Sequence, residues 1–247
     1  MLNNQLCIFG DSIYCGVTFD ETFGRYTLCR NTFDKKLRSF GVTVRNNARP
    51  GCTTDIALNH RDEARVLPGA VCLISFGGND SDLEWEKVAA DPDHYHEGKV
   101  SLAQFKENIR ELILFAREKQ MQPVVCTPLP VAAERYFETF SKGLDRSALM
   151  RYLHNTEYIY RWQERYALGA QQVACSMNCE VFDLRSIFLY QRDFSALMCR
   201  DGIHPSAAGY ALMTQAFCSF WGVESASDTQ SQRVFHPFFN PASAFSF

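Results

Sequence analysis

Four short blocks of the sequence carry the residue types that catalyse acyl transfer. In chain order they are Gly10-Asp11-Ser12, Gly51, Gly78-Asn79-Asp80 and Asp201-Gly202-Ile203-His204. Together they supply a hydroxyl nucleophile, donors for an oxyanion, and an imidazole base with a carboxylate to orient it. This set of groups predicts cleavage of an ester through a serine.

The first block places a serine where a nucleophile would be needed. Ser12 follows an apolar segment and a glycine, so we expect it where the chain leaves a sheet, at or near a helix N-terminus. Backbone N–H groups at such a position point outward and stabilise developing negative charge. Taken alone, the tripeptide Gly-Asp-Ser is also compatible with an ordinary turn.

Two further blocks offer donors for the same oxyanion. Gly51 follows Arg49-Pro50 and lets the backbone approach a ligand closely, although in isolation an ordinary Pro-Gly turn is the favoured interpretation. Asn79 closes the most hydrophobic segment of the chain. Its side-chain amide can point to the same place, and capping the next helix is its alternative role.

The last block contains an acid and a base three residues apart. Asp201 and His204 lie in a stretch with Gly202 and Pro205, which indicates a turn rather than a long helix. The spacing lets the carboxylate accept from one ring nitrogen and leaves the other nitrogen to take a proton from Ser12. A structural pair would explain them separately, but all four blocks lie at strand ends or beside the last helix, so coincidence is the poorer explanation.

The elements that must position these blocks follow an alternating pattern. Five short apolar segments are expected to be strands: Leu6–Phe9, Val42–Asn46, Val71–Phe76, Pro123–Thr127 and Glu180–Leu184. Helical patterns lie between them, which predicts a parallel sheet with helices on both faces. The clearest helix covers about Leu102–Lys119 with Ser101 as its N-cap, and a final helix follows Pro205 and ends at Gly222.

Two connections, at about residues 81–100 and 131–161, are too long to be simple turns. Both follow predicted strands, so we expect them on one side of the sheet, where they would wall a pocket. Arg135, Tyr136, Phe137, Tyr158, Tyr160 and Trp162 lie in or beside the second insertion. The aromatic residues either bind an apolar acyl or aromatic group or pack the insertion onto the body. Arg49 and Arg135 would suit an anionic substrate group, but structural roles are favoured.

The chain is expected to form one domain over residues 1–223, followed by a polar linker and a Phe-rich tail at 224–247, because 247 residues with 46% hydrophobic content suffice for one core. We expect the tail to pack on its own domain, with docking on a second subunit of a homo-oligomer as the alternative. No internal repeat is present.

Composition excludes several classes of protein. A formal net charge of −3 without a basic stripe argues against a nucleic-acid partner. Ten cysteines at irregular spacing indicate buried free thiols, and no apolar run has the roughly 18 residues of a transmembrane segment. We therefore expect a cytoplasmic protein. Asp91, Asp93, His94 and His96 lie in a polar loop, and a metal there is disfavoured; no cofactor is expected.

In these four blocks, from about Leu6 to Trp221, the sequence resembles the SGNH or GDSL hydrolases. The resemblance implies a three-layer α/β/α sandwich with a five-stranded parallel sheet like that of flavodoxin, and a metal-free serine hydrolase acting on carboxylic esters or thioesters. It implies that Ser12 is the nucleophile, His204 the general base and Asp201 its orienter. The Ser12 N–H, the Gly51 N–H and the Asn79 side chain would form the oxyanion hole.

The expected function is hydrolysis of a small-molecule ester through an acyl-enzyme on Ser12. A small acyl ester, an O-acetyl carbohydrate and a lipid ester all remain open as substrates. An acyltransferase using the same acyl-enzyme and a non-catalytic, flavodoxin-like binding module are the alternatives. Since the base must be neutral, kcat/KM should fall below about pH 6 to 7, near the usual pKa of a histidine.

Overall fold

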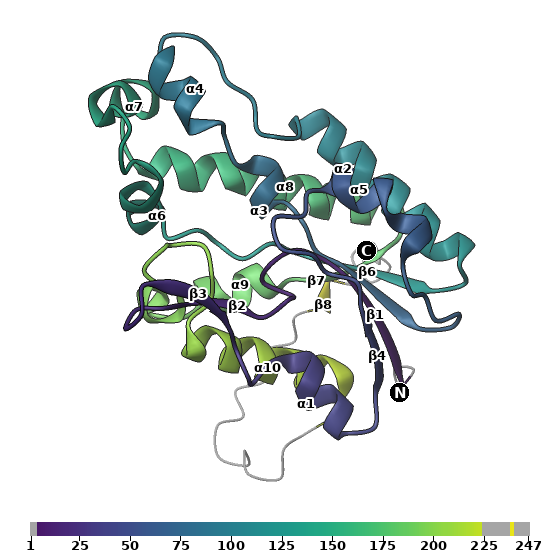
Figure 1. The fold of residues 1–247 in the computed structure, drawn as a ribbon. Coiled ribbons are helices and arrows are strands. Elements are labelled where there is room, and N and C mark those ends of the chain that lie inside the picture. Colours follow the sequence, from purple (N-terminus) through teal and green to yellow (C-terminus); the bar gives the residue numbers. More distant parts are fainter. Residues whose placement is uncertain (1–3, 224–237, 240–247) are drawn as a thin grey trace, which may run out of the picture.

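Five parallel strands form the centre of the computed structural model, which describes residues 4–223 and 238–239 (Figure 1). They are β1 (Gln5–Phe9), β4 (Thr43–Asn46), β5 (Val71–Ile74), β6 (Gln122–Cys126) and β7 (Glu180–Phe182). Their order is β4-β1-β5-β6-β7, and the short strand β8 (Phe238–Phe239) pairs antiparallel with β7. All five predicted strands are therefore confirmed, with ends shifted by one or two residues.

The strands are apolar on both sides because helices cover both faces of the sheet. Phe9, Cys72 and Ile74 pack in one core cluster, whereas their strand neighbours Ile8 and Leu73 pack in the other. Alternate side chains of a strand point to opposite faces, and parallel sheets covered on both sides give such continuous apolar runs. The fold is thus three layers, helices, sheet and helices, as predicted.

The layer on one face contains α2 (Thr54–Asn59), α5 (Leu102–Glu118) and α8 (Glu157–Ser176), and the opposite layer contains α1 (Phe33–Ser39), α9 (Leu184–Leu189) and α10 (Ala207–Trp221) (Figure 1). The Ser101 hydroxyl accepts a hydrogen bond from the Gln104 N–H at the start of α5, as its predicted capping role requires. Gly222 ends α10 in the left-handed conformation.

Both long insertions lie on the same side, at the carboxyl ends of the strands. The first contains α3 (Gly78–Ser81), which begins just before it, and α4 (Trp85–Ala90); the second contains α6 (Ala133–Phe140) and α7 (Arg146–Leu153). Helices α4 and α7 contact each other, and Figure 1 shows both beyond the same end of the sheet. Two 3₁₀ helices, η1 (Arg61–Glu63) and η2 (Phe194–Leu197), complete the short elements.

An antiparallel hairpin between β1 and α1 was not predicted. It consists of β2 (Val17–Asp20) and β3 (Arg25–Leu28) and forms its own two-stranded sheet. All four residues of β3 are exposed, so the segment lacks the apolar alternation that identifies a half-buried strand. Figure 1 shows the hairpin beyond the same end of the sheet as the insertions.

Two residues of the predicted tail are described. The backbone of Phe238 and Phe239 pairs with Phe182 and Val181 of the same chain. The rest of 224–247, and with it the prediction of how the tail docks, lies outside the described residues.

All ten cysteines lie in the described part and are free thiols, seven of them buried. Over residues 4–223 and 238–239, no helix combines the length and apolarity needed to cross a bilayer.

Candidate active site

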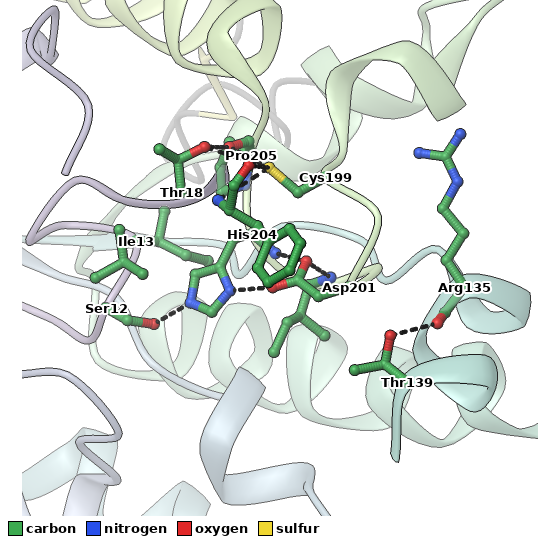
Figure 2. Close-up of polar contacts among 12 residues, drawn as sticks. Ser12, Ile13, Thr18, Arg135, Thr139, Cys199, Asp201, His204 and Pro205 are labelled. Atoms are coloured by element: carbon green, nitrogen blue, oxygen red, sulfur yellow. Dashed lines mark hydrogen bonds and ion pairs between the residues drawn. The ribbon is translucent and has the colours of Figure 1, made fainter. Parts of the chain in front are cut away.

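Three of the sequence-selected residues form a continuous chain of hydrogen bonds (Figure 2). Ser12 Oγ lies 2.9 Å from His204 Nε2, and His204 Nδ1 lies 2.6 Å from Asp201 Oδ2. Ser12 is partly exposed, whereas His204 and Asp201 are buried. The arrangement leaves the hydroxyl accessible and shields its two partners from water.

The environment of Asp201 holds it in the ionised form. Its Oδ1 accepts hydrogen bonds from the backbone N–H groups of Ile203 and His204, both at 3.1 Å. Burial by itself raises the pKa of this carboxyl, but the His204 ring and the two N–H groups outweigh that effect and lower the pKa below its usual value. An ionised Asp201 requires a proton on His204 Nδ1, which leaves the Nε2 lone pair facing Ser12.

Gly202, between the acid and the base, is pressed against another element. It has a φ of +80°, and a Cβ at this position would lie 2.4 Å from the backbone N of Tyr136 and 2.6 Å from the carbonyl O of Ala132. The Ala132 N–H donates to the Gly202 carbonyl at 2.8 Å. The loop that carries Asp201 and His204 is therefore locked against the start of α6.

Ser12 lies in a turn rather than at the start of a helix, so this part of the prediction was wrong. The Cys15 N–H donates to the Asp11 carbonyl at 3.2 Å, and the Ile13 N–H donates to Asp11 Oδ1 at 3.0 Å. The chain then enters β2 instead of continuing as a helix. Burial raises the pKa of the Asp11 carboxyl to about 6.

The two remaining predicted residues differ in position. Asn79, in α3, borders the same cavity as Ser12, and its Nδ2 donates to the Cys52 carbonyl at 3.2 Å. Gly51 precedes Cys52, has a φ of +70°, is exposed, and is outside the set of residues that line this cavity. Ser12, Asn79 and His204 thus line one cavity, Asp201 is hydrogen-bonded to His204, and Gly51 is not among the lining residues.

The carboxylate of the third block, which had no role in the sequence-based prediction, is buried and connects this block to the second. Asp80 accepts hydrogen bonds from the Thr54 N–H and hydroxyl at 2.8 and 2.5 Å and from the Gly77 N–H at 3.2 Å. Burial raises its pKa to about 6 even though these donors lower it. Asp80 ties the Asn79 turn to the start of α2.

Sequence reasoning also missed Tyr26, which packs against the base. Its ring, on β3, lies edge-on to the His204 ring with centroids 5.2 Å apart, and 53% of the side chain is exposed. Burial of the phenol and the nearby Asp201 carboxylate raise the pKa of Tyr26. The Thr18 hydroxyl of the same hairpin donates to the Pro205 carbonyl at 3.0 Å (Figure 2). No signal in the sequence marked this contact, because it depends on how the hairpin folds over the loop.

A cavity of about 90 Å³ opens beside Ser12 and His204. Both insertions line it, as predicted, and the second contributes Tyr136 and the start of α8 contributes Tyr158 and Trp162. Phe137 is buried in the core instead, and the Arg185 guanidinium lies over the Tyr160 ring. Some of these aromatic residues therefore face the cavity and others serve packing.

The candidate arginines and metal ligands have structural partners. Arg135 Nη1 donates to the carbonyls of Ser195 and Met198 at 2.7 and 2.8 Å, and Arg49 forms an exposed ion pair with Glu63 at 3.0 Å. In the polar loop, His94 and His96 bond to the side chain and carbonyl of Asp91, and Asp93 pairs with Arg151. Among the described residues no group of three or more His, Cys, Asp or Glu is placed to hold a metal ion.

Comparisons with known proteins give a family match and a set of similar folds. A model of the GDSL-like lipase/acylhydrolase family matches residues 8–212. No curated protein sequence gave a significant match.

Similar solved structures include a lipase/acylhydrolase from Enterococcus faecalis, with a TM-score of 0.61 and 21% identity over 87% of this chain and 94% of that chain. An acetylxylan esterase from Geobacillus stearothermophilus has a TM-score of 0.60 and 19% identity over 90% of this chain and 96% of that one. An alpha/beta hydrolase enzyme from the Lake Arreo metagenome has a TM-score of 0.60 and 18% identity, covering 91% and 98%. At these identities the similarity shows a shared fold.

Proposed function

The chain belongs to the GDSL-like lipase/acylhydrolase family and is a serine esterase, and from this premise we propose that it hydrolyses carboxylic esters through an acyl-enzyme on Ser12. The observation that carries the proposal is the hydrogen-bonded series from Asp201 through His204 to a partly exposed Ser12 beside a cavity. A structural Asp–His pair has no need of an accessible hydroxyl at its outer nitrogen.

In the first step, Ser12 Oγ attacks the ester carbonyl while His204 Nε2 takes the hydroxyl proton. The imidazolium that forms keeps its second proton on Nδ1, hydrogen-bonded to Asp201 Oδ2 at 2.6 Å. A buried, ionised carboxylate at this distance stabilises the positive ring. The carbonyl oxygen becomes an oxyanion, which we assign to the Ser12 N–H, the Asn79 side-chain amide and the Gly51 N–H.

In the second step, the tetrahedral intermediate collapses and His204 donates its Nε2 proton to the departing alcohol. A water molecule then takes the place of the alcohol, His204 removes its proton, and the hydroxide oxygen attacks the acyl carbon on Ser12. Release of the acid returns the proton to Ser12 Oγ. Asn79 can serve both steps if its amide exchanges the Cys52 carbonyl, 3.2 Å away, for the oxyanion.

The test is active-site labelling with a fluorophosphonate, read by intact mass, with a p-nitrophenyl ester assayed in parallel. Ser39, an exposed serine whose hydroxyl donates to the Lys36 carbonyl in α1, provides the matched control. We expect one adduct and turnover in wild type and in Ser39→Ala, and neither in Ser12→Ala. Labelling that survives in Ser12→Ala would refute the nucleophile assignment.

Other outcomes separate the alternatives. A folded wild type that neither labels nor turns over would favour a binding module, which needs no nucleophile. Formation of a new ester in the presence of an added alcohol, at the expense of the free acid, would identify an acyltransferase.

A further inference from the structure

We infer that the cavity beside Ser12 binds an uncharged, apolar alkyl or aryl group of the ester and excludes sugars and anionic groups. This inference rests on the proposed function, because it names the class of substrate that the Ser12 site takes. It is argued from the faces, the hydrogen bonds and the charges of the cavity wall.

Much of the wall consists of aromatic and aliphatic side chains. Trp85 stacks on Phe140 with centroids 3.9 Å apart, and Tyr158 stacks on Trp162 at 6.0 Å, so neighbouring rings hold two of the aromatic side chains in place. Leu129, Ile159 and Ile203 line other parts of the cavity. Fixed apolar surfaces of this kind favour the burial of alkyl and aryl groups.

Several polar groups of the same wall are already engaged within the protein. Four of the lining side chains that carry donors, from the two insertions and α8, donate to protein acceptors. These bonds are Trp85 Nε1 to Asp82 Oδ1 (3.0 Å), Tyr136 Oη to the same oxygen (2.5 Å), Trp162 Nε1 to the Ser81 carbonyl (2.7 Å) and Gln163 Nε2 to the Leu129 carbonyl (3.0 Å). A sugar entering the cavity would leave hydroxyls without partners, and each such loss weakens binding by about tenfold or more.

The charges of the wall disfavour anions. Asp11 and Asp82 are among the described residues that line the cavity, and that lining includes no lysine or arginine. Lys99 is already paired with Asp82 Oδ2 at 2.7 Å. A carboxylate or phosphate on the substrate would be desolvated next to these acids without a free cation to compensate. Neutral, apolar esters are therefore the substrates that fit this wall.

The first experiment measures kcat/KM for two series of esters. One series lengthens the acyl group of p-nitrophenyl esters from acetate through butyrate to hexanoate, and the other lengthens the alcohol of alkyl acetates and adds 2-phenylethyl acetate and an acetylated methyl xyloside. We expect a rise of about fourfold per buried methylene in the series whose variable group occupies the cavity. We also expect 2-phenylethyl acetate to react faster than the xyloside acetate.

A charge test uses pairs in which a carboxylate replaces an isopropyl group of the same shape. For the acyl side the pair is p-nitrophenyl hemisuccinate and p-nitrophenyl 4-methylpentanoate, and for the alcohol side it is 3-acetoxypropanoate and 3-methylbutyl acetate. On the side that responds to chain length, the anionic ester should react at least about tenfold more slowly than its neutral partner.

A cation placed on the wall should reverse this discrimination. Tyr158, half-buried in the cavity lining, is replaced in Tyr158→Arg, and Tyr190→Arg at a 70% exposed position on the end of α9 provides a matched change of net charge. The ratio of anionic to neutral rates should rise about tenfold or more in Tyr158→Arg and stay unchanged in Tyr190→Arg. Because the readout is a ratio, a partial loss of folded protein does not affect it.

Rates that are flat in both series, equal rates within the charged pair, or a preference for the acetylated xyloside would each overturn the inference. In those cases the Ser12 labelling would still stand, and the proposed function with it. Absence of labelling and turnover in the folded wild type would instead remove the proposed function.

Discussion

Replacing Gly202 by alanine should inactivate the esterase without unfolding it. The φ of +80° costs an alanine about 1–2 kcal/mol. In addition, the new Cβ would lie 2.4 Å from the Tyr136 backbone N, roughly 1 Å closer than an ordinary van der Waals contact. Backbone cannot rotate away from such a contact, so the Asp201–His204 loop must shift.

The shift would be transmitted directly to the base. His204 lies two residues beyond Gly202, and its Nε2 is 2.9 Å from Ser12 Oγ. A displacement of about 1 Å in a catalytic group typically costs around 100-fold in rate. We therefore expect kcat/KM of Gly202→Ala for a p-nitrophenyl ester to fall by about two orders of magnitude, together with a similar loss in the rate of fluorophosphonate labelling.

The chain offers a matched control. Gly143, between α6 and α7, has a φ of +82°, and a Cβ there would meet no heavy atom within 4 Å. Gly143→Ala should therefore lose stability only through backbone strain, which is measured as a lower free energy of unfolding in urea. Its activity should be unchanged. If Gly202→Ala stays within about threefold of wild-type kcat/KM, the loop tolerates the contact and the reasoning from close packing is refuted.

Asn79→Ala should lower kcat by about 10²- to 10³-fold while circular dichroism remains native, as expected for the loss of one oxyanion donor; an unchanged kcat would contradict that role. Tyr26→Ala should reduce kcat/KM by several-fold by removing the ring beside His204, whereas Tyr26→Phe keeps the ring and should retain most activity; equal losses in both would show that the phenol matters instead. Burial raises the pKa of the Asp11 carboxyl to about 6 in the folded protein, above the roughly 3.9 of an aspartate in an unfolded chain, so its protonation favours the native state at low pH and this contribution is lost as pH rises through about 6. Lowering the pH from 7 to 5 should therefore stabilise wild type relative to Asp11→Asn in urea unfolding, and a constant difference would argue against it. Ser101→Ala should cost about 1 kcal/mol in the free energy of unfolding with kcat/KM unchanged, and a loss of activity at constant stability would contradict the purely capping role.

The sheet, and the site at the carboxyl ends of its strands, could be predicted from sequence because apolar runs mark the strands and glycines mark the turns that follow them. β5 is buried at every position. Ser101 caps the start of α5 and Gly222 caps the end of α10, both with ordinary capping residues. Counting only the parallel strands, the order is 2-1-3-4-5, so the chain reverses its winding direction between β1 and β5. Ligands bind at such a switch point, which explains why the blocks after these two strands meet at one cavity.

What could not be predicted depends on contacts between elements. The β2–β3 hairpin has no buried face, so nothing in its pattern signalled a strand, and the Tyr26 contact with His204 was missed with it. The turn at Ser12 resembles a helix start in sequence but leads into β2. Likewise, the engagement of Trp85 and Tyr136 with Asp82 joins residues from separate insertions, a pairing that no local spacing reveals.

The hydrogen bond between Ser12 and His204 joins residues 192 positions apart, and β1 lies between β4 and β5, which follow it in the chain. A contact of this span forms only after a large loop-closure entropy has been overcome, and folds rich in such contacts fold slowly. During synthesis the nucleophile leaves the ribosome long before its base. A partly made or partly folded chain therefore contains Ser12 but lacks the assembled site and its activity. Hydrolytic activity thus measures how many molecules have completed folding.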